Sequence, residues 1–80
     1  MLIWNTVSGR QNLPRDGDRI WHKARIGGVE VNRIGIVRNT NNILTIYPAY
    51  THLSNEFAET RIVSDGLVWA LSERKEVPHA

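Results

Sequence analysis

The feature that most constrains this chain is a pair of adjacent glycines, Gly27 and Gly28, placed between two runs rich in β-branched residues. The central positions of a two-residue hairpin turn need positive φ, which glycine adopts without steric cost. The stretch 18–37 therefore predicts a long β-hairpin, and its turn sets the strand register. The expected cross-strand pairs are Ile26 with Val29, Arg25 with Glu30, and Ala24 with Val31.

Uninterrupted pairing beyond these residues would place the apolar residues of the two strands on opposite faces. A β-bulge at residues 32–33 corrects this and sets Trp21 across from Gly35, on the outer face. The residues then expected on the core face are Ile20, His22, Ile34 and Ile36. The outer face of the first strand carries Arg19, Trp21, Lys23 and Arg25.

The rest of the chain predicts short strands separated by turn-forming residues. In chain order we expect an edge strand over 2–7, a loop over 8–17, a polar turn over 38–42, a third core strand over 43–47 and one helical turn within 50–58. A second hairpin is expected around Asp65-Gly66, pairing Ile62 with Trp69. Both faces of that hairpin are apolar, which favours burial in a barrel corner or at an interface.

Length and composition predict one small soluble domain. The chain has 80 residues and no cysteine, so we expect a single domain over 1–80, with a core over about 2–72 and a charged tail over 73–80. A core this thin needs barrel closure or a second copy, and we expect a homodimer. The absence of cysteine fits a reducing compartment, and neither a signal sequence nor a membrane span is evident, so we expect a cytoplasmic protein.

The order of elements resembles that of SH3-like barrels, the class that includes KOW and Tudor modules. The resemblance rests on Gly17-Asp18-Arg19-Ile20, which opens the first strand, and on Gly35-Ile36-Val37 in the second, and it covers about residues 17–72. It implies an all-β fold in the form of a small SH3-like barrel. A strongly bent antiparallel sheet of five to six strands, with at most one short helical turn, is the alternative.

A second, fragmentary similarity is to the small plasmid-borne dihydrofolate reductases, tetrameric chains with SH3-like folds. It rests on residues 17–20, on Lys23 and on Thr45-Ile46-Tyr47-Pro48. The active pore of that family uses a Gln-Ile-Tyr strand and a nearby lysine, whereas Thr45 stands at the glutamine position here and has no amide. The segment between the two motifs does not align. We therefore do not carry the reductase activity over to this chain.

Catalytic constellations are otherwise missing from the sequence. The three histidines, His22, His52 and His79, lack metal-ligand spacing, and no cysteine joins them. Asp16 and Asp18 flank Gly17 as turn residues do, so they do not predict a general acid and base. We expect no enzyme activity, no metal and no cofactor.

Binding is the remaining class of function, and the charge distribution bears on it. Residues 1–40 carry seven Lys or Arg against three acids, whereas residues 41–80 carry three against five. The candidate binding residues are Arg15, Arg19, Trp21, Lys23, Arg25, Arg38, Tyr47 and Tyr50. For a protein partner the candidate anchors are the aromatic residues Trp4, Trp21, Tyr47 and Tyr50. We expect an interaction module that contacts a protein partner, for example an inhibitor or accessory protein of phage or mobile-element type. The alternative is a nucleic-acid-binding module that uses the basic and aromatic hairpin face.

Overall fold

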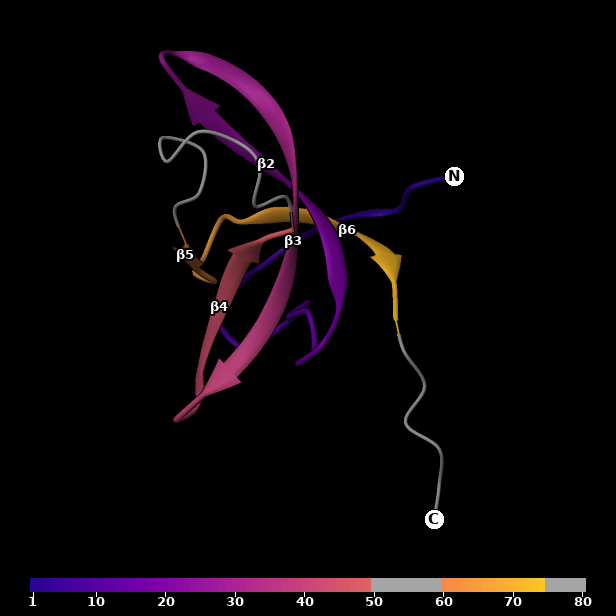
Figure 1. The fold of residues 1–80 in the computed structure, drawn as a ribbon, viewed down its shortest axis with the longest axis vertical. Helices are drawn as coiled ribbons and strands as arrows, with labels where there is room; N and C mark the ends of the chain where they lie inside the picture. The colour runs from indigo at the N-terminus through magenta and orange to yellow at the C-terminus, as the bar shows by residue number, and fades with distance from the viewer. Residues whose placement is uncertain (50–59, 75–80) are drawn as a thin grey trace.

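A computed structural model describes residues 1–49 and 60–74 and shows a single antiparallel sheet of six strands (Figure 1). The strands are β1 (Trp4–Thr6), β2 (Arg19–Ile26), β3 (Val29–Thr40), β4 (Ile43–Pro48), β5 (Arg61–Ile62) and β6 (Val68–Glu73). Their order across the sheet is β1-β6-β2-β3-β4-β5. The all-β prediction is confirmed, and the predicted helical turn within 50–58 lies outside the described residues.

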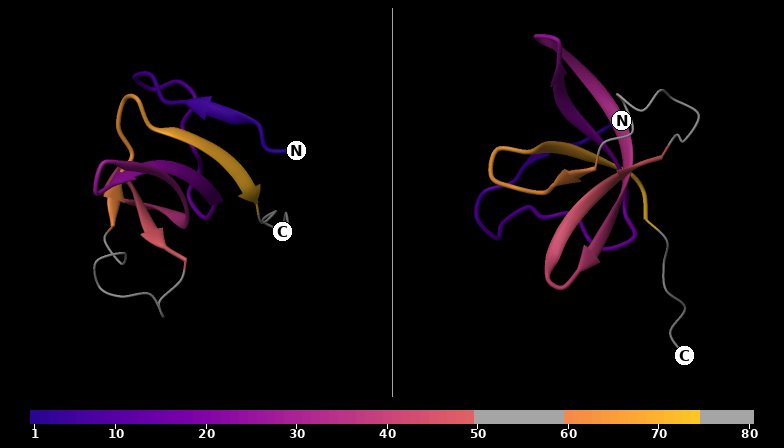
Figure 2. Two further views of the ribbon diagram at one scale, coloured as in Figure 1. Left: turned by 90° about the horizontal axis from the view of Figure 1, so that it is seen from above. Right: turned by 60° about the vertical axis from the view of Figure 1, so that its left-hand side comes forward.

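The sheet is strongly bent but not closed into a barrel (Figure 2). Within the described residues its two edges, β1 and β5, do not pair with each other. Of the two predicted forms, the bent antiparallel sheet is therefore the one that the structure adopts. Within the described residues there is also no helix long and apolar enough to cross a membrane.

The Gly27-Gly28 turn and the register that it sets are confirmed. Gly27 has φ 59° and Gly28 has φ 79°, as a primed turn requires. Beyond the turn the prediction is wrong, because the pairing of β2 with β3 continues without a bulge and sets Trp21 across from Ile34. Gly35 instead lies opposite Ile20.

The close approach of β4 explains why a glycine stands at position 35. A Cβ there would overlap Cγ2 of Ile46 and would lie 2.8 Å from the carbonyl oxygen of Tyr47. The prediction of a bulge failed because it assumed that all apolar residues share one face. The sheet buries apolar side chains on both faces.

The inner face holds the main hydrophobic core, which consists of Val7, Ile20, Val37, Ile46, Leu67 and Trp69. The outer face has a smaller buried set, in which Ala70 is 0% exposed and Ile34 is 8% exposed. Both lie next to Trp21 in the register, and neither belongs to the inner core. Ile34 and Ile36 therefore lie on the outer face, opposite to the predicted arrangement.

The turn between β3 and β4 is shorter than predicted. Asn41 and Asn42 have φ values of 53° and 66°, and Thr40 pairs with Ile43 across them. Asparagine tolerates this left-handed conformation better than most residues. Residues 38–40, which we assigned to the polar turn, therefore continue β3.

The predicted hairpin around Asp65-Gly66 does not exist. β5 pairs with β4 at one edge, while β6 lies between β1 and β2. The chain at Asp65-Gly66 forms a turn in which the backbone N–H of Leu67 donates to the Ser64 carbonyl at 3.1 Å. Of the two central residues only Gly66 has positive φ, as in a type II turn. The backbone of Val7 pairs with Gly66 and Leu67 and draws the chain away from β5.

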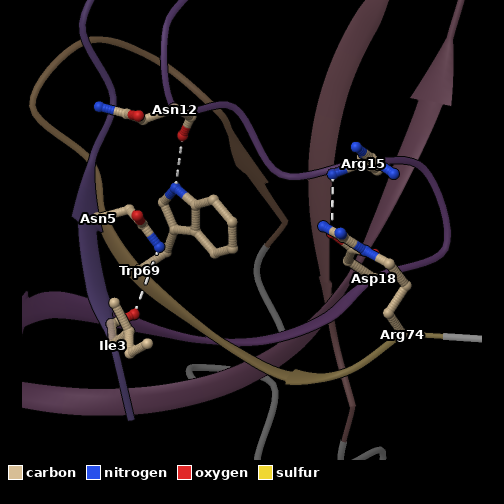
Figure 3. A network of polar contacts seen from close by, with 7 residues as sticks. All are labelled: Ile3, Asn5, Asn12, Arg15, Asp18, Trp69 and Arg74. Atoms are coloured by element: carbon tan, nitrogen blue, oxygen red, sulfur yellow. Dashed lines mark hydrogen bonds and ion pairs between the residues drawn. The ribbon is translucent and has the colours of Figure 1, made fainter.

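Two contacts fix β6 at its place in the sheet (Figure 3). The indole Nε1 of Trp69 donates to the Asn12 carbonyl at 2.8 Å, which holds the loop over 8–17 against the inner face. Arg74 donates from two nitrogens to the Asp18 carboxylate, at 2.9 and 2.8 Å. Glu73 and Arg74, which we assigned to the tail, thus belong to the folded structure.

Candidate binding surfaces

The outer face of the sheet carries an array of aromatic and apolar side chains. The register forms one row from Trp4 through Ala70 and Trp21 to Ile34. A neighbouring row runs from Arg19 through Ile36 to Tyr47. We call the four larger accessible apolar side chains of these rows, Trp4, Trp21, Ile36 and Tyr47, the outer aromatic face.

The outer aromatic face is open to solvent at both ends. Trp4 is 37% exposed and Tyr47 is 43% exposed, while Trp21 and Ile36 between them are half-buried. Ile36 lies directly opposite Tyr47 and diagonal to Trp21, which corresponds to Cβ separations of about 5 Å and about 7–8 Å in an antiparallel sheet. Only the small Ala70 separates Trp21 from Trp4, so the four side chains form one patch. Trp4, Trp21 and Tyr47 were predicted as anchors for a protein partner, and the pairing of β1 with β6 is what places Trp4 on the same face as the other two.

The cations predicted on the outer face are less available than the sequence suggests. Lys23 Nζ lies 3.2 Å from a carboxylate oxygen of Glu30 and 4.9 Å from the centre of the Trp4 ring. Arg19 is half-buried, and its Nε is buried without a hydrogen-bond partner among the described residues. Arg25 is exposed. The outer face is therefore more apolar and less cationic than predicted.

The distal half of the β2–β3 hairpin projects from the sheet, as Figures 1 and 2 show. Its pairing with β6 ends at His22, and the pairing of β3 with β4 ends at Gly35. We call residues 23–32 the arm. Within the described residues, the strands of the arm pair only with each other.

A cleft lies on the inner side of the arm, with a volume of about 490 Å³. We call it the arginine cleft, because its lining includes Arg25, Arg33 and Arg61 together with Ala24, Ile26, Gly27 and Thr60. Arg61 reaches it because β5 pairs with β4, which sets Arg61 opposite Ile46. Sequence reasoning missed Arg61 and Arg33, since the two-residue strand β5 has no periodic pattern and Arg33 was placed in a bulge.

Two acceptors in β2 hold Arg61. Its Nη1 donates to the Lys23 carbonyl at 2.7 Å and lies 3.3 Å from His22 Nδ1. An arginine nitrogen can only donate, so Nδ1 of His22 accepts this bond and the neutral ring carries its proton on Nε2. These bonds fix the base of the arm against β5.

His22 is buried and neutral, as a structural histidine. Burial, followed by the charges of Arg61 and Arg33, lowers the pKa of His22 from 6.5 to about 4. Only 4% of His22 is exposed, so water would not screen a positive charge on its ring. The guanidinium groups of Arg61 and Arg33 would repel that charge. His22 is therefore a hydrogen-bond acceptor for Arg61 at neutral pH.

Asp18 is a structural carboxylate, and Asp16 has a similar role. Burial alone would raise the pKa of Asp18, but hydrogen bonds from Arg74 and from the Arg15 backbone, with the charges of both arginines, hold the pKa below its ordinary value. Asp16 accepts from the backbone N–H of Asn39 at 2.8 Å. The structure uses both aspartates to join the loop over 8–17 to β3 and β6.

The other predicted binding residues are dispersed. Arg15 is exposed in the loop before β2, and Arg38 is exposed on β3 opposite Thr45, near the Asn41-Asn42 turn. Tyr50 lies outside the described residues. In the part of the chain that the structure describes, no group of three or more metal-binding side chains comes together.

Comparison with known proteins gives no match: no family model, curated protein or solved structure matches this chain.

Proposed function

We propose that this chain is a non-catalytic interaction module that binds a partner protein through the outer aromatic face. The observation that supports it is the exposure of Trp4 and Tyr47, at 37% and 43%, at the two ends of one apolar patch on an open sheet. A patch of this kind on a small domain is typical of a surface that a partner covers. Such a face suits an inhibitor or accessory protein that acts by occluding a surface of its target.

The residue types of the patch are those that dominate protein interfaces. Tryptophan, tyrosine and arginine supply most interface hot spots. The two aromatic residues bury a large area with only about two side-chain torsions each, so little conformational entropy is lost. Trp4 is also held in place by Lys23, whose ammonium lies 4.9 Å from its ring. A side chain that is already ordered loses less entropy when the partner binds.

The charges of this face favour a protein over a nucleic acid as its partner. Glu30 engages Lys23 at 3.2 Å, and Arg19 is half-buried, so two of the three predicted outer cations are not freely presented to phosphates. Nucleic-acid binding draws most of its affinity from cations that meet phosphates. An apolar patch with a partly neutralised rim instead matches the core and rim of a protein interface.

Affinity capture followed by rebinding tests the proposal. The immobilised chain should capture a protein which, once purified, binds wild type directly, and Tyr47→Ala should weaken that binding about tenfold or more, or about 1.4 kcal/mol. Trp4→Ala should have an effect of similar size. Val29→Ala is the matched control, because Val29 is 61% exposed but lies on the arm, away from this face.

Two results would contradict the proposal. One is a purified partner that binds Tyr47→Ala and Trp4→Ala as tightly as wild type, and the other is an equal loss with Val29→Ala. If the captured protein is a second copy of this chain, light scattering should report a dimer that Tyr47→Ala converts to a monomer. The partner protein would then be the chain itself, as the expected homodimer requires.

A further inference from the structure

We propose that the arm binds double-stranded DNA by entering the major groove, with its cations contacting the phosphates on both sides. This proposal rests on the arginines of the arm and the arginine cleft and on none of the four side chains of the outer aromatic face. Its basis is that arginines lie on both faces of a projecting two-stranded ribbon. Strand alternation sets Arg25 on the outer face and Arg33 on the inner face, and both line the arginine cleft together with Arg61.

The shape of the arm fits the groove. Four cross-strand pairs, from Lys23–Asn32 to Ile26–Val29, separate its base from the turn, which corresponds to about 13 Å of strand. The major groove of B-form DNA is about 8.5 Å deep and about 12 Å wide and admits a two-stranded ribbon. The tip is narrow because Gly27 and Gly28 have no side chains, and no described atom lies within 4 Å of where their Cβ atoms would be.

The charges of the arm fit the phosphates that border the groove. Among the described residues, the arm and the arginine cleft hold three arginines, Arg25, Arg33 and Arg61, besides Lys23 and Glu30, which pair with each other at 3.2 Å. Arg61 is pre-oriented by its bonds to Lys23 and His22, so little ordering is needed before it meets a phosphate. Arginine can contact phosphate oxygens through two nitrogens at once.

This arrangement favours duplex DNA over the other polyanions. An acidic peptide bound in the arginine cleft would follow one side of the arm, whereas the two backbones that flank a groove run along both of its sides. Duplex RNA has a deep, narrow major groove that does not admit a ribbon. The tip residues Ile26 and Val29 have no hydrogen-bonding side-chain groups for base edges, so we expect little dependence on DNA sequence.

Fluorescence anisotropy with a mixed-sequence DNA duplex of about 20 base pairs tests the proposal, with the salt concentration varied. Wild type should bind, and its log affinity should fall with log salt with a slope of about 0.9 for each phosphate contacted. Arg61→Gln should weaken binding about tenfold and reduce that slope by about one. Glu30→Gln, which removes the acid of the arm, should tighten binding.

Matched controls separate the effect of the charges on the arm from the effect of the net charge of the protein. Arg10→Gln removes the same charge from an exposed residue of the loop over 8–17, and it should leave affinity and slope unchanged. An RNA duplex of the same sequence should bind at least about tenfold more weakly than the DNA. Circular dichroism of each variant checks that the sheet is intact.

The following outcomes would overturn the proposal. They are a dissociation constant for duplex DNA weaker than about 100 μM at low salt, equal affinity for RNA, an equal effect of Arg10→Gln, or tighter binding to polyglutamate of equal charge.

The Tyr47→Ala variant distinguishes this proposal from the proposed function. Loss of a protein partner on Tyr47→Ala, with DNA binding unchanged, would support both proposals. Loss of DNA binding on Tyr47→Ala alone would assign DNA to the outer aromatic face and refute the role of the arm.

Discussion

The two ends of the β2–β3 hairpin differ in what surrounds them. At the sheet end, Ile20 and Val37 are 0% exposed and Asp18 is 1% exposed, because β6, β4 and the loop over 8–17 cover them. At the arm end, Arg25 and the turn glycines are exposed. One pair of strands thus provides both the centre of the core and a projecting surface.

The difference separates stability from binding along a single element. Substitutions at the sheet end remove buried contacts and should lower the free energy of unfolding. Substitutions in the arm remove few buried contacts and should lower that free energy by about 1 kcal/mol or less, while they alter what the protein binds.

The largest expected effect comes from two isoleucines on the same strand and the same face. Ile20→Ala should lower the free energy of unfolding by about 3–4 kcal/mol, because a fully buried side chain is replaced by a cavity. Ile26→Ala should cost about 1 kcal/mol or less, since Ile26 is half-buried at the tip of the arm. Urea unfolding of both variants measures the contrast.

Equal losses in the two isoleucine variants would break the comparison. They would mean that the arm is packed as tightly as the sheet end. A small loss for Ile20→Ala alone would contradict the core that the register places around β2.

The next largest effect is the pH dependence that arises from His22, which lies where the sheet ends and the arm begins. The unfolded chain takes up a proton near pH 6.5, but the folded chain does so only near pH 4. Stability that is present at pH 7 is therefore lost as the pH falls from about 6.5 to 4, by about 3 kcal/mol in total. Urea midpoints at several pH values test this loss.

His22→Gln isolates this contribution, because it removes the titrating group and leaves an amide oxygen that can accept from Arg61. We expect the variant to lose most of the slope of stability against pH between 6.5 and 4. Below that range, protonation of Asp18 should destabilise both proteins, since its pKa is lowered by its partners. An unchanged slope in His22→Gln would contradict a buried, neutral His22.

The sequence predicts correctly those structural features that are determined by residues close to one another in the chain. The Gly27-Gly28 turn and the pairs beside it are correct because a two-residue turn fixes its own register. The predicted bulge failed because the face that Ile34 occupies depends on Trp21 and Ala70, and Ala70 belongs to a strand that the sequence had paired elsewhere. Local patterns contain no information about such distant partners.

The same limit applies to the candidate sites. The outer positions of Lys23 and Arg25 follow from strand alternation and were predicted correctly. The arginine cleft was not predicted, because Arg61 enters it only when β5 pairs with β4. Trp4 joins the outer aromatic face only through β6.

A smaller effect is expected at the glycine turns, where backbone strain can be compared between the two regions. Gly66 has φ 87° and Gly28 has φ 79°, and at both positions a Cβ would meet no described atom within 4 Å. Gly66→Val should cost about 2 kcal/mol, because a β-branched residue resists positive φ and this turn also carries bonds to Val7. The melting temperature measures the loss.

Gly28→Val should cost less, about 1 kcal/mol, because the arm can relax without disturbing the core. The measurement is again the melting temperature. If Gly28→Val is the more destabilising of the two, the arm is the more rigid region and the comparison is reversed. An unchanged melting temperature for Gly66→Val would show that no turn with positive φ is needed there.

The smallest expected effect concerns the ion pair of the arm. Lys23 Nζ lies 3.2 Å from Glu30, but the two side chains are 38% and 56% exposed, so water screens the attraction. Exposed pairs contribute about 0.2–1 kcal/mol, and Glu30→Gln keeps an oxygen that can still accept from Lys23. We therefore expect the free energy of unfolding, measured in urea, to change by less than about 0.5 kcal/mol. A loss of more than about 1 kcal/mol in the free energy of unfolding would show that the charge of Glu30 stabilises the fold. Charge changes in the arm would then affect stability as well as binding, contrary to the comparison drawn between the two ends of the hairpin.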